Sequence, residues 1–319
     1  MTSILISGGT GFLGGHISKY LLDDPLFTRV AILSRDWHKQ NALRSELGNP
    51  EHFRWFIGDV RDRDRLKRAF DGIDYIIHAA AIKDVVSSEY NPRETMLTNV
   101  IGTQNVIDAA IDCGVRRVIT ISSDKGCLPL SCYGKTKALA ESLTIAANSY
   151  SPRITKFSVA RYGNVTASSS SVIPLFRKQS VSGVLTITDL DMTRFWLSPR
   201  QAVDFIFQCL DKMVGGEIFV PHLPSSKIVD LALAISPQAK IEVIGTRPGE
   251  KKHEVMVSSD EASHTRDYGW AYVVEPQFPF WNREFRSGGS PVPADWAYSS
   301  ASAQRLSRDN IKVMLDDTE

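Results

Sequence analysis

The sequence is poor in the residues that usually carry disulfide or metal chemistry. Its 319 residues include four cysteines, at positions 113, 127, 132 and 209, and no two of them form a CxxC pair. This spacing offers no disulfide framework and is typical of a protein from a reducing compartment. The seven histidines likewise show no metal-ligand spacing, so we expect no bound metal.

The chain also lacks a strong net charge and a long apolar run. A formal net charge of +1 gives no reason to expect nucleic acid or an anionic membrane as a partner. No apolar run is long enough to cross a bilayer, and an apolar strand begins almost at the first residue, which leaves no room for a signal peptide. We therefore expect a cytoplasmic protein. The length suits one large domain or two interleaved ones.

What the sequence does contain is a regular alternation of short apolar runs and longer periodic runs over its first half. The short runs predict strands and the periodic runs predict helices. This alternation favours an α/β fold with a doubly wound parallel sheet. The expected strands are Ser3–Ser7, Val30–Leu33, Arg54–Ile57, Tyr75–His78, Val118–Ile121 and Lys156–Ala160, and the expected helices are Ile17–Leu22, Asn41–Leu47, Asp62–Phe70, Glu94–Cys113 and Tyr133–Asn148.

The turn after the first expected strand has the spacing of a dinucleotide-binding fingerprint. Gly8, Gly11 and Gly14 lie between that strand and the first helix. Glycines there permit a tight turn and a close approach of a pyrophosphate to the helix N-terminus. The alternative is a purely structural turn. We expect the cofactor to contact Gly8, Thr10, Gly11, Phe12, Leu13 and Gly14.

The end of the second expected strand favours NADP as the cofactor. Arg35 follows Ser34 at the strand end, and Lys39 lies one turn further. An arginine here can bind a 2′-phosphate through two hydrogen bonds. Asp36 keeps NAD as the alternative, because a carboxylate can hold a free ribose 2′-hydroxyl. Further cofactor contacts are expected after later strands, at Asp59 and Val60 beside the adenine and at Ala79, Ala80, Ala81, Ser122 and Val165.

A second group of chemically active residues follows the strand Val118–Ile121. Tyr133 and Lys137 are four residues apart, which puts phenol and ammonium on one face of a helix. A free phenol titrates at about 10, and an adjacent cation lowers that pKa. The pair therefore has the spacing for proton removal from a hydroxyl during hydride transfer, next to the nicotinamide.

Asp124 and Lys125 lie at the end of the same strand, where open α/β sheets place their ligands. Neighbours on a regular strand point to opposite faces, so both can serve one pocket only if the strand has ended. The alternative is an exposed ion pair in a connection. Cys127 and Cys132 lie in the same loop, but no histidine is near them in the sequence to activate a thiol. We therefore interpret both cysteines as small buried side chains with a packing role.

The regular alternation ends after Asn164. A helix at Asp204–Lys212 and a strand at Glu217–Val220 return to the sheet. Residues 1–165 and 199–221 are therefore expected to form the NADP-binding domain. Residues 166–198 and 222–319 contain too little regular structure for a second nucleotide fold, and we expect them to form a smaller interleaved lobe that binds the substrate.

Together these features resemble the extended short-chain dehydrogenase/reductase family. The chain looks like the UDP-N-acetylglucosamine 4,6-dehydratases of the inverting, 5-epimerising kind, which supply pseudaminic acid and capsule pathways. The resemblance implies NADP, a UDP-sugar substrate and a homo-oligomer, with a hexamer as the candidate assembly. It rests on Gly58–Asp62, His78–Lys83, Ser123–Lys125, Arg161–Val165, Asp191–Trp196, Gly216–Pro221 and Arg247–Lys251.

The resemblance also implies a catalytic role for four residues. Tyr133, helped by Lys137, removes the proton of the C4 hydroxyl. Lys125 then takes the C5 proton, and Asp124 donates a proton to the departing C6 hydroxyl. Retaining hexose dehydratases carry aspartate and glutamate at the positions of Asp124 and Lys125. The lysine at position 125 therefore predicts inversion at C5. This chemistry requires Lys125 neutral and Asp124 protonated, the reverse of their states in solution.

The family's substrate contacts correspond to residues spread over much of the chain. One departure is clear, because the family's substrate loop carries an arginine where this chain has Ser169. Three other functions remain open: a dehydratase for a different UDP-sugar, a nucleotide-sugar 4-epimerase or dehydrogenase that uses Tyr133 and Lys137 alone, and a silent NADP-binding regulator. The expected substrate contacts are Lys83, Asn164, Ser169, Val172, Arg194, Arg247 and Glu250.

Overall fold

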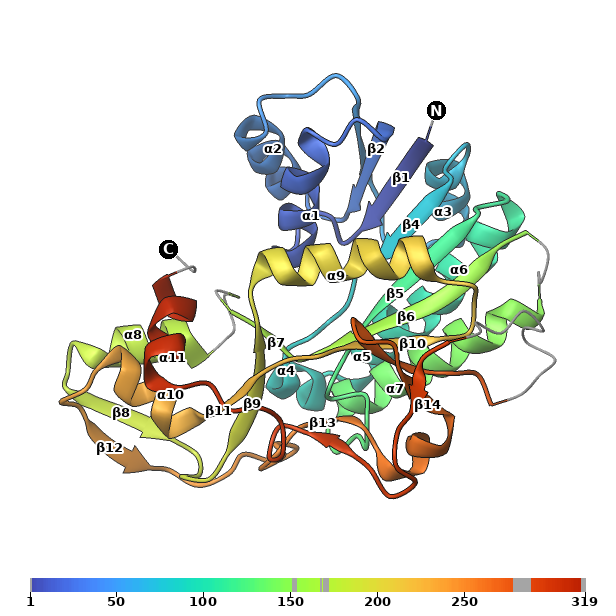
Figure 1. The fold of residues 1–319 in the computed structure, drawn as a ribbon. Coiled ribbons are helices and arrows are strands. Elements are labelled where there is room, and N and C mark those ends of the chain that lie inside the picture. The colour runs from blue at the N-terminus through green and yellow to red at the C-terminus, as the bar shows by residue number, and fades with distance from the viewer. Residues whose placement is uncertain (1, 151–153, 167, 169–171, 278–287, 317–319) are drawn as a thin grey trace.

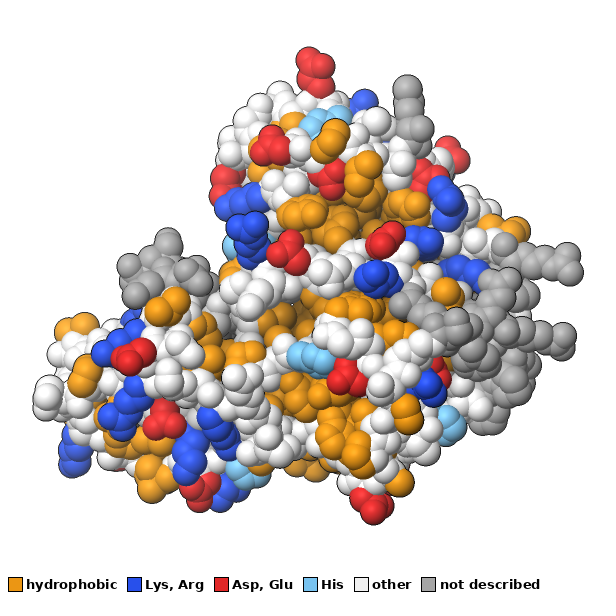
Figure 2. Space-filling model, in the orientation of Figure 1, with side chains coloured by type: hydrophobic (Ala, Val, Ile, Leu, Met, Phe, Trp, Pro, Cys, Tyr) orange, Lys and Arg blue, Asp and Glu red, His pale blue; other side chains and the backbone are white. Residues whose placement is uncertain are grey.

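The structure is a computed structural model that describes residues 2–150, 154–166, 168, 172–277 and 288–316. The expected fold class is confirmed. A large, mostly parallel sheet lies between layers of helices, and a smaller lobe lies beside it (Figure 1). On the face shown in Figure 2, basic and acidic side chains are interspersed over the smaller lobe, while apolar side chains gather around helix α9 (Pro199–Lys212).

The parallel part of the sheet has the strand order β3-β2-β1-β4-β5-β6-β10. The order changes direction between β1 and β4, because β2 and β3 lie on one side of β1 and all later strands on the other. Ligands of open α/β sheets bind outside the carboxyl ends of the strands at such a switch point. The strands are β1 Thr2–Ser7, β2 Phe27–Ser34, β3 Phe53–Ile57, β4 Tyr75–His78, β5 Arg117–Ser123, β6 Lys156–Tyr162 and β10 Ile218–Pro221.

Strand β1 shows why the sheet is covered on both faces. Ile4 and Ile6 pack in one apolar cluster with Ile17 and Ile206, which come from helices α1 (Phe12–Leu22) and α9. Leu5 points the other way, into a second cluster built with helices α3 (Arg63–Phe70) and α6 (Gly102–Asp112). Successive side chains of a strand alternate between faces, so a continuous apolar run demands a helix layer on each side.

Three antiparallel strands extend the sheet beyond β10. Strand β15 (Ala271–Val274) pairs with β10, β14 (Thr265–Asp267) pairs with β15, and β16 (Ser290–Pro291) pairs with β14. The sequence pattern predicts that this part of the chain belongs to the smaller lobe. It joins the sheet because Ala271, Val273 and Val274 are apolar enough to be buried against it. The run is short and follows a turn-rich stretch, so its periodicity alone does not identify it.

The long helix expected from Glu94 to Cys113 is interrupted. Helix α5 (Pro92–Met96) leads into a π-helical turn at Leu97–Ile101, and α6 continues to Asp112. A separate helix, α4 (Val85–Tyr90), precedes them and was not expected. Proline is well placed at the start of α5, where no backbone N–H is needed.

The smaller lobe has its own apolar core, built around Ile173, Phe176, Leu185, Leu231 and Ile311. It contains α8 (Val172–Ser180), α10 (Ile228–Ile235), α11 (Arg308–Asp316) and the parallel pair β8 (Val184–Ile187) and β12 (Lys240–Val243). Strand β9 (Thr193–Leu197) pairs with β7 (Asn164–Val165) and β11 (Ser225–Lys227) in a separate three-stranded sheet.

Two kinds of feature are absent from the described residues. No helix there is long and apolar enough to cross a membrane. No group of three or more His, Cys, Asp and Glu side chains in that part of the chain could hold a metal ion.

Candidate active site

The turn between β1 and α1 has a backbone that only glycine fits. Gly8 adopts a φ of 71°, and a Cβ there would lie 2.8 Å from the Cα of Ala80. A Cβ at Gly14 would lie 2.5 Å from the Gly8 carbonyl oxygen. Gly11 caps α1 without a side-chain hydrogen bond among the described residues. The first N–H groups of α1 are thus open to an anion, so this turn fits the pyrophosphate of a dinucleotide.

The end of β2 presents cations to the same edge of the sheet. Asp36 caps helix α2 (Trp37–Glu46) by accepting a hydrogen bond of 3.1 Å from the Lys39 backbone, which lowers the pKa of the Asp36 carboxyl. The Arg35 side chain is mostly exposed and lies 3.8 Å from Asp59. Ser34 accepts a 3.0 Å hydrogen bond from Gln40, which fixes the strand end.

Helix α2 and the end of β3 contribute further residues to this edge of the sheet. Lys39 lines a cleft of about 310 Å³ between α1 and α2, together with Thr10 and Phe12. The Asp59 carboxylate accepts hydrogen bonds from Arg61; burial raises its pKa, but these bonds outweigh burial and lower it overall. Val60 is buried. The expected cofactor residues thus follow the ends of β1, β2, β3 and β4.

A cavity of about 720 Å³ opens at the carboxyl ends of the strands, between the sheet and the smaller lobe. This volume is in the range of small-molecule sites, roughly 300–1,000 Å³. Residues expected to bind the cofactor and residues expected to act on the substrate both line this cavity. Ser169 lies outside the described residues. The expected residues that line the cavity are Phe12, Leu13, Ala79, Ala81, Lys83, Ser122, Lys125, Tyr133, Lys137, Asn164, Val165, Val172, Arg194, Arg247 and Glu250.

Tyr133 and Lys137 lie in the first turns of helix α7 (Cys132–Ala146). Ser131 caps this helix by accepting a hydrogen bond of 3.1 Å from the Gly134 backbone. Lys137 is buried and donates to the carbonyl oxygen of Ile121; burial lowers its pKa to about 8. Burial also raises the pKa of Tyr133 to about 12. Desolvation outweighs the charge of Lys125, the cation that lowers this pKa, so the direction differs from the lowering expected from Lys137.

Asp124 is completely buried in the turn after β5. Its Oδ1 accepts hydrogen bonds of 2.7 Å from Ser123 Oγ and 3.0 Å from Lys125 Nζ. Its Oδ2 has no hydrogen-bond partner among the described residues. Strand β5 ends at Ser123, so Asp124 and Lys125 are free of the alternation that would send them to opposite faces.

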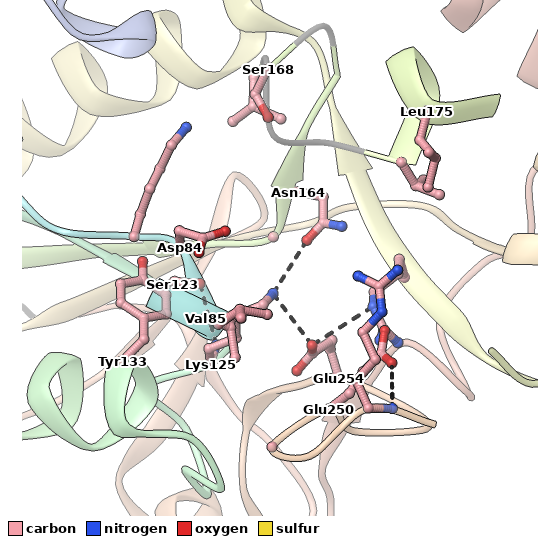
Figure 3. Close-up of a pocket in the computed structure, with 18 of the residues that line it drawn as sticks. Asp84, Val85, Ser123, Lys125, Tyr133, Asn164, Ser168, Leu175, Glu250 and Glu254 are labelled. Carbon is pink, nitrogen blue, oxygen red and sulfur yellow. Dashed lines mark hydrogen bonds and ion pairs between the residues drawn. The ribbon is translucent and has the colours of Figure 1, made fainter. Parts of the chain in front are cut away.

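Lys125 lines the cavity and is surrounded by oxygen atoms (Figure 3). Its Nζ lies 3.0 Å from Asp124 Oδ1, 3.3 Å from Glu254 Oε1 and 3.5 Å from Asn164 Oδ1. Burial lowers the pKa of Lys125, but the two carboxylates outweigh it and raise the pKa overall. The structure therefore holds Lys125 as an ammonium ion, and the neutral lysine that the resemblance requires must arise by loss of a proton.

The start of α7 touches this turn directly. A side chain at Gly134 would run into the carbonyl oxygen of Lys125 and would lie 3.1 Å from Pro129 Cβ. The loop between them turns outward, with Leu128 and Leu130 exposed. The backbone contact sets the separation between Lys125 and the neighbouring Tyr133.

The smaller lobe contributes a second set of charges. Arg194, on β9, is buried and lies 3.4 Å from Glu250. Glu250 also accepts a hydrogen bond of 3.3 Å from the Arg247 backbone. Lys83 also lines the cavity, 5.9 Å from the centre of the Phe12 ring, and burial lowers its pKa. Several cations therefore line the cavity, which suits an anionic ligand.

Two contributors were missed by sequence reasoning. Glu254 stands just beyond the run Arg247–Lys251 and reaches Lys125, while Lys251 donates a 3.3 Å hydrogen bond to the Asp124 carbonyl oxygen. The run Arg247–Lys251 is evident in the sequence, but nothing in it shows that Lys251 and Glu254 face the turn after β5. That contact depends on the packing of the two halves of the chain.

A buried ion network connects α7 to the C-terminal part of the chain. Arg161 Nη2 lies 2.6 Å from Glu141 Oε2 and 2.9 Å from Glu261 Oε1, and Arg161 Nη1 donates to the Met256 carbonyl oxygen. Ser122 completes the network by donating to Glu141. Arg161 thus fixes the helix that carries Tyr133 against the segment that follows Glu254.

Sequence comparison places these features in a known group. Residues 4–276 match the family described as polysaccharide biosynthesis protein. A Campylobacter jejuni protein named UDP-N-acetylglucosamine 4,6-dehydratase (inverting) is 45% identical over 93% of this chain and 92% of its own length. A Rickettsia conorii protein named UDP-glucose 4-epimerase is 39% identical over 98% of this chain and 95% of its own length.

Solved structures agree with the fold. The chain is similar to Pen from Bacillus thuringiensis, with a TM-score of 0.91 and 33% identity over 99% of this chain and 97% of that one. It is also similar to DesIV, a dTDP-glucose 4,6-dehydratase from Streptomyces venezuelae solved with NAD bound, with a TM-score of 0.70 and 25% identity over 78% and 86% of the chains. The chain therefore belongs to the polysaccharide biosynthesis protein family, within the extended short-chain dehydrogenases/reductases.

Proposed function

We propose that the protein is an NADP-dependent 4,6-dehydratase of UDP-N-acetylglucosamine that inverts C5. Its product is UDP-2-acetamido-2,6-dideoxy-β-L-arabino-hex-4-ulose. The observation that carries this proposal is the Asp124–Lys125 pair, joined by a 3.0 Å hydrogen bond beside Tyr133. A carboxyl and an amine at this point suit an elimination of water, which a simple epimerase or dehydrogenase does not need. The relative from Campylobacter jejuni carries the same activity in its name.

Three of the four residues each move one proton, and Lys137 assists Tyr133. Tyr133 takes the proton of the C4 hydroxyl, with the Lys137 ammonium next to it. Lys125 takes the C5 proton, which a keto group at C4 makes acidic. Asp124 gives its proton to the C6 hydroxyl, which leaves as water. A nicotinamide dinucleotide held by its pyrophosphate at the glycine turn would supply the hydride acceptor and donor for this reaction. A proton returned to C5 on the opposite face completes the net loss of one water and inverts that centre.

The hydrogen bond between Lys125 and Asp124 also supplies a route to the protonation states that the reaction needs. Moving one proton from Lys125 Nζ to Asp124 Oδ1 turns the ion pair into a neutral amine and a carboxylic acid. Both residues are shielded, and a closed site that excludes water favours the neutral pair. The two groups therefore titrate as one coupled unit.

NADP is the proposed cofactor because Arg35 and Lys39 bring cations to the end of β2, while Asp36 is occupied in capping α2. We assign residues 1–165 and 199–221 to cofactor binding, and residues 166–198 and 222–319 to the substrate, apart from the strands β14–β16 in the sheet. We further propose that the enzyme acts in the cytoplasm as a homo-oligomer, with a hexamer as the candidate assembly.

One NMR time course tests the reaction. The protein is incubated with UDP-N-acetylglucosamine in heavy water, in parallel with NADP and with NAD. We expect a 4-keto-6-deoxy sugar with deuterium at C5, faster with NADP, and no net consumption of the cofactor. A C4 epimer with an intact C6 hydroxyl would instead support the epimerase function for which the Rickettsia relatives are named. Cofactor binding without turnover across UDP-sugars would support a silent regulator.

A further inference from the structure

Glu254 is a buried carboxylate that faces the catalytic turn from the other half of the chain. It is 2% exposed, yet it lines the cavity. Its backbone is fixed on both sides, because its N–H donates to Ser300 Oγ at 2.9 Å and its carbonyl accepts from the Ser300 N–H at 2.8 Å. The position of the Glu254 side chain is therefore set by the fold of the C-terminal segment.

Three cations surround this carboxylate. Oε1 lies 3.3 Å from Lys125 Nζ and 3.8 Å from Arg194 Nε, and Oε2 lies 3.7 Å from Lys251 Nζ. Oε2 has no hydrogen-bond partner among the residues that the structure describes. A buried charge that is only partly hydrogen-bonded is costly for stability. Such a residue calls for a role beyond packing, and its shortest ionic contact is with the amine that removes the C5 proton.

We propose that Glu254 is a positioning residue for the elimination, which holds the Lys125 amine in place and stabilises the ammonium that forms when Lys125 takes the C5 proton. This inference rests on the proposed function. In the step concerned, the C5–H bond breaks and its proton joins Lys125 Nζ. The electron pair of that bond forms a C5–C6 double bond, and the C6–O bond breaks. The departing hydroxyl takes the Asp124 proton and leaves as water.

The charges around Lys125 determine the expected direction of change. Asp124 from its own turn and Glu254 from the C-terminal segment favour the ammonium, while Arg194 on β9 disfavours it. Tyr133 on α7 also faces Lys125. Replacing Glu254 by an uncharged isostere removes one of the two favourable charges and leaves Arg194 in place. Lys125 then becomes a weaker base, whose neutral form is present at lower pH.

The first test measures Lys125 itself and needs no turnover. In E254Q, E254D and wild type, the pH dependence of Lys125 acetylation is followed by peptide mass spectrometry. We expect Lys125 of E254Q to react about tenfold faster at a given pH below its midpoint, since each unit of pKa changes the neutral fraction about tenfold. E254D keeps the charge and should stay near wild type. Equal reactivity in E254Q and wild type would overturn the proposal.

The second test uses the reaction in the same variants. We expect E254Q to lower kcat by roughly tenfold to a hundredfold, as for a weakened general base. The KM should change by less than about threefold, the Lys125 limb of the pH–rate profile should move to lower pH, and deuterium should enter C5 more slowly. E254D should recover part of the rate. A change in KM alone, or an unshifted pH profile, contradicts the proposal.

A matched control separates a local effect from a change of net charge. Asp260 is an exposed carboxylate a few residues from Glu254, and D260N should behave like wild type in both tests. Circular dichroism confirms that E254Q is folded. If wild type fails to dehydrate the sugar, the proposed function fails, while the Lys125 titration still decides whether Glu254 controls that amine.

Discussion

The two walls of the cavity are supplied by the chain in different ways. The sheet wall takes Lys125, Tyr133 and Lys137 from one continuous segment, the end of β5 and the start of α7, which also contains the fully buried Asp124. The lobe wall takes Arg194 from β9 and a further set of charges from the run beginning at Arg247. The first wall therefore has a local geometry that a short motif can encode, while the second exists only after the two halves of the chain have packed.

This difference suggests a division of labour between the two walls. The sheet wall carries groups that move protons, so changes there should act on kcat. The lobe wall carries cations that suit a diphosphate, so changes there should act on KM. Glu254 is the exception, because it stands in the lobe wall and touches the catalytic amine.

The largest expected effect lies in the sheet wall. Lys125→Met removes the proposed general base, and we expect kcat to fall by about 10²–10⁴-fold, with cofactor binding retained. Turnover is measured by the appearance of the 4-keto-6-deoxy sugar, and cofactor affinity by calorimetry. Lys240→Met, at an exposed position on β12, is the matched control. Turnover of K125M close to wild type would show that another group is the base.

A change at the junction of the two walls should act on stability. Arg161→Met leaves Glu141 buried without its cation, and we expect a loss of about 3–5 kcal/mol in the free energy of unfolding. Urea denaturation measures this loss. Adding Glu141→Gln to the same chain should restore part of it, since the unpaired charge is then removed. A loss as large in the double variant as in R161M would contradict this account of the network.

A smaller effect is expected in the lobe wall. Arg247→Ala should raise the KM for the UDP-sugar by about tenfold, equivalent to roughly 1.4 kcal/mol, because a cation suited to a diphosphate is lost. The kcat should change much less than in K125M. Initial rates over a range of substrate concentrations give both constants. If kcat falls while KM stays constant, the division between the two walls is wrong.

The smallest expected effect concerns the pKa of Lys137. Burial lowers this pKa to about 8, below the value of about 10.5 for an unfolded lysine. Between these values the unfolded chain binds more protons, so stability should rise with pH over this window. Relative to Lys137→Met, the wild type should gain about 1 kcal/mol between pH 8 and pH 9. Urea denaturation of both proteins at the two pH values measures this difference.

The comparison of the walls also explains what the sequence could and could not predict. The α/β alternation, the glycine turn and the spacing of Tyr133 and Lys137 are local patterns, and the fold that they predict is confirmed. Strands β14 and β15 could not be predicted, because they are short and depend on an existing sheet edge for pairing partners. The contact between Glu254 and Lys125 could not be predicted for a related reason, since the two residues lie far apart in the chain.

Electrostatics was the least predictable part of the site. The spacing of Tyr133 and Lys137 suggests a lowered phenol pKa, but the depth of burial reverses the direction. Lys125 shows the opposite balance, because two carboxylates overcome its burial. Both outcomes depend on how closely charges approach and how well water is excluded, and neither quantity can be read from the order of residues.

The close approach of Gly134 to the carbonyl oxygen of Lys125 has a consequence for how such enzymes diversify. The two ends of the loop that separates them are pinned together by their backbones. Its outward part, with Leu128 and Leu130 exposed, can therefore change in length or in sequence while Lys125 and Tyr133 keep their separation. New docking partners could be acquired at that tip without retuning the chemistry beneath it.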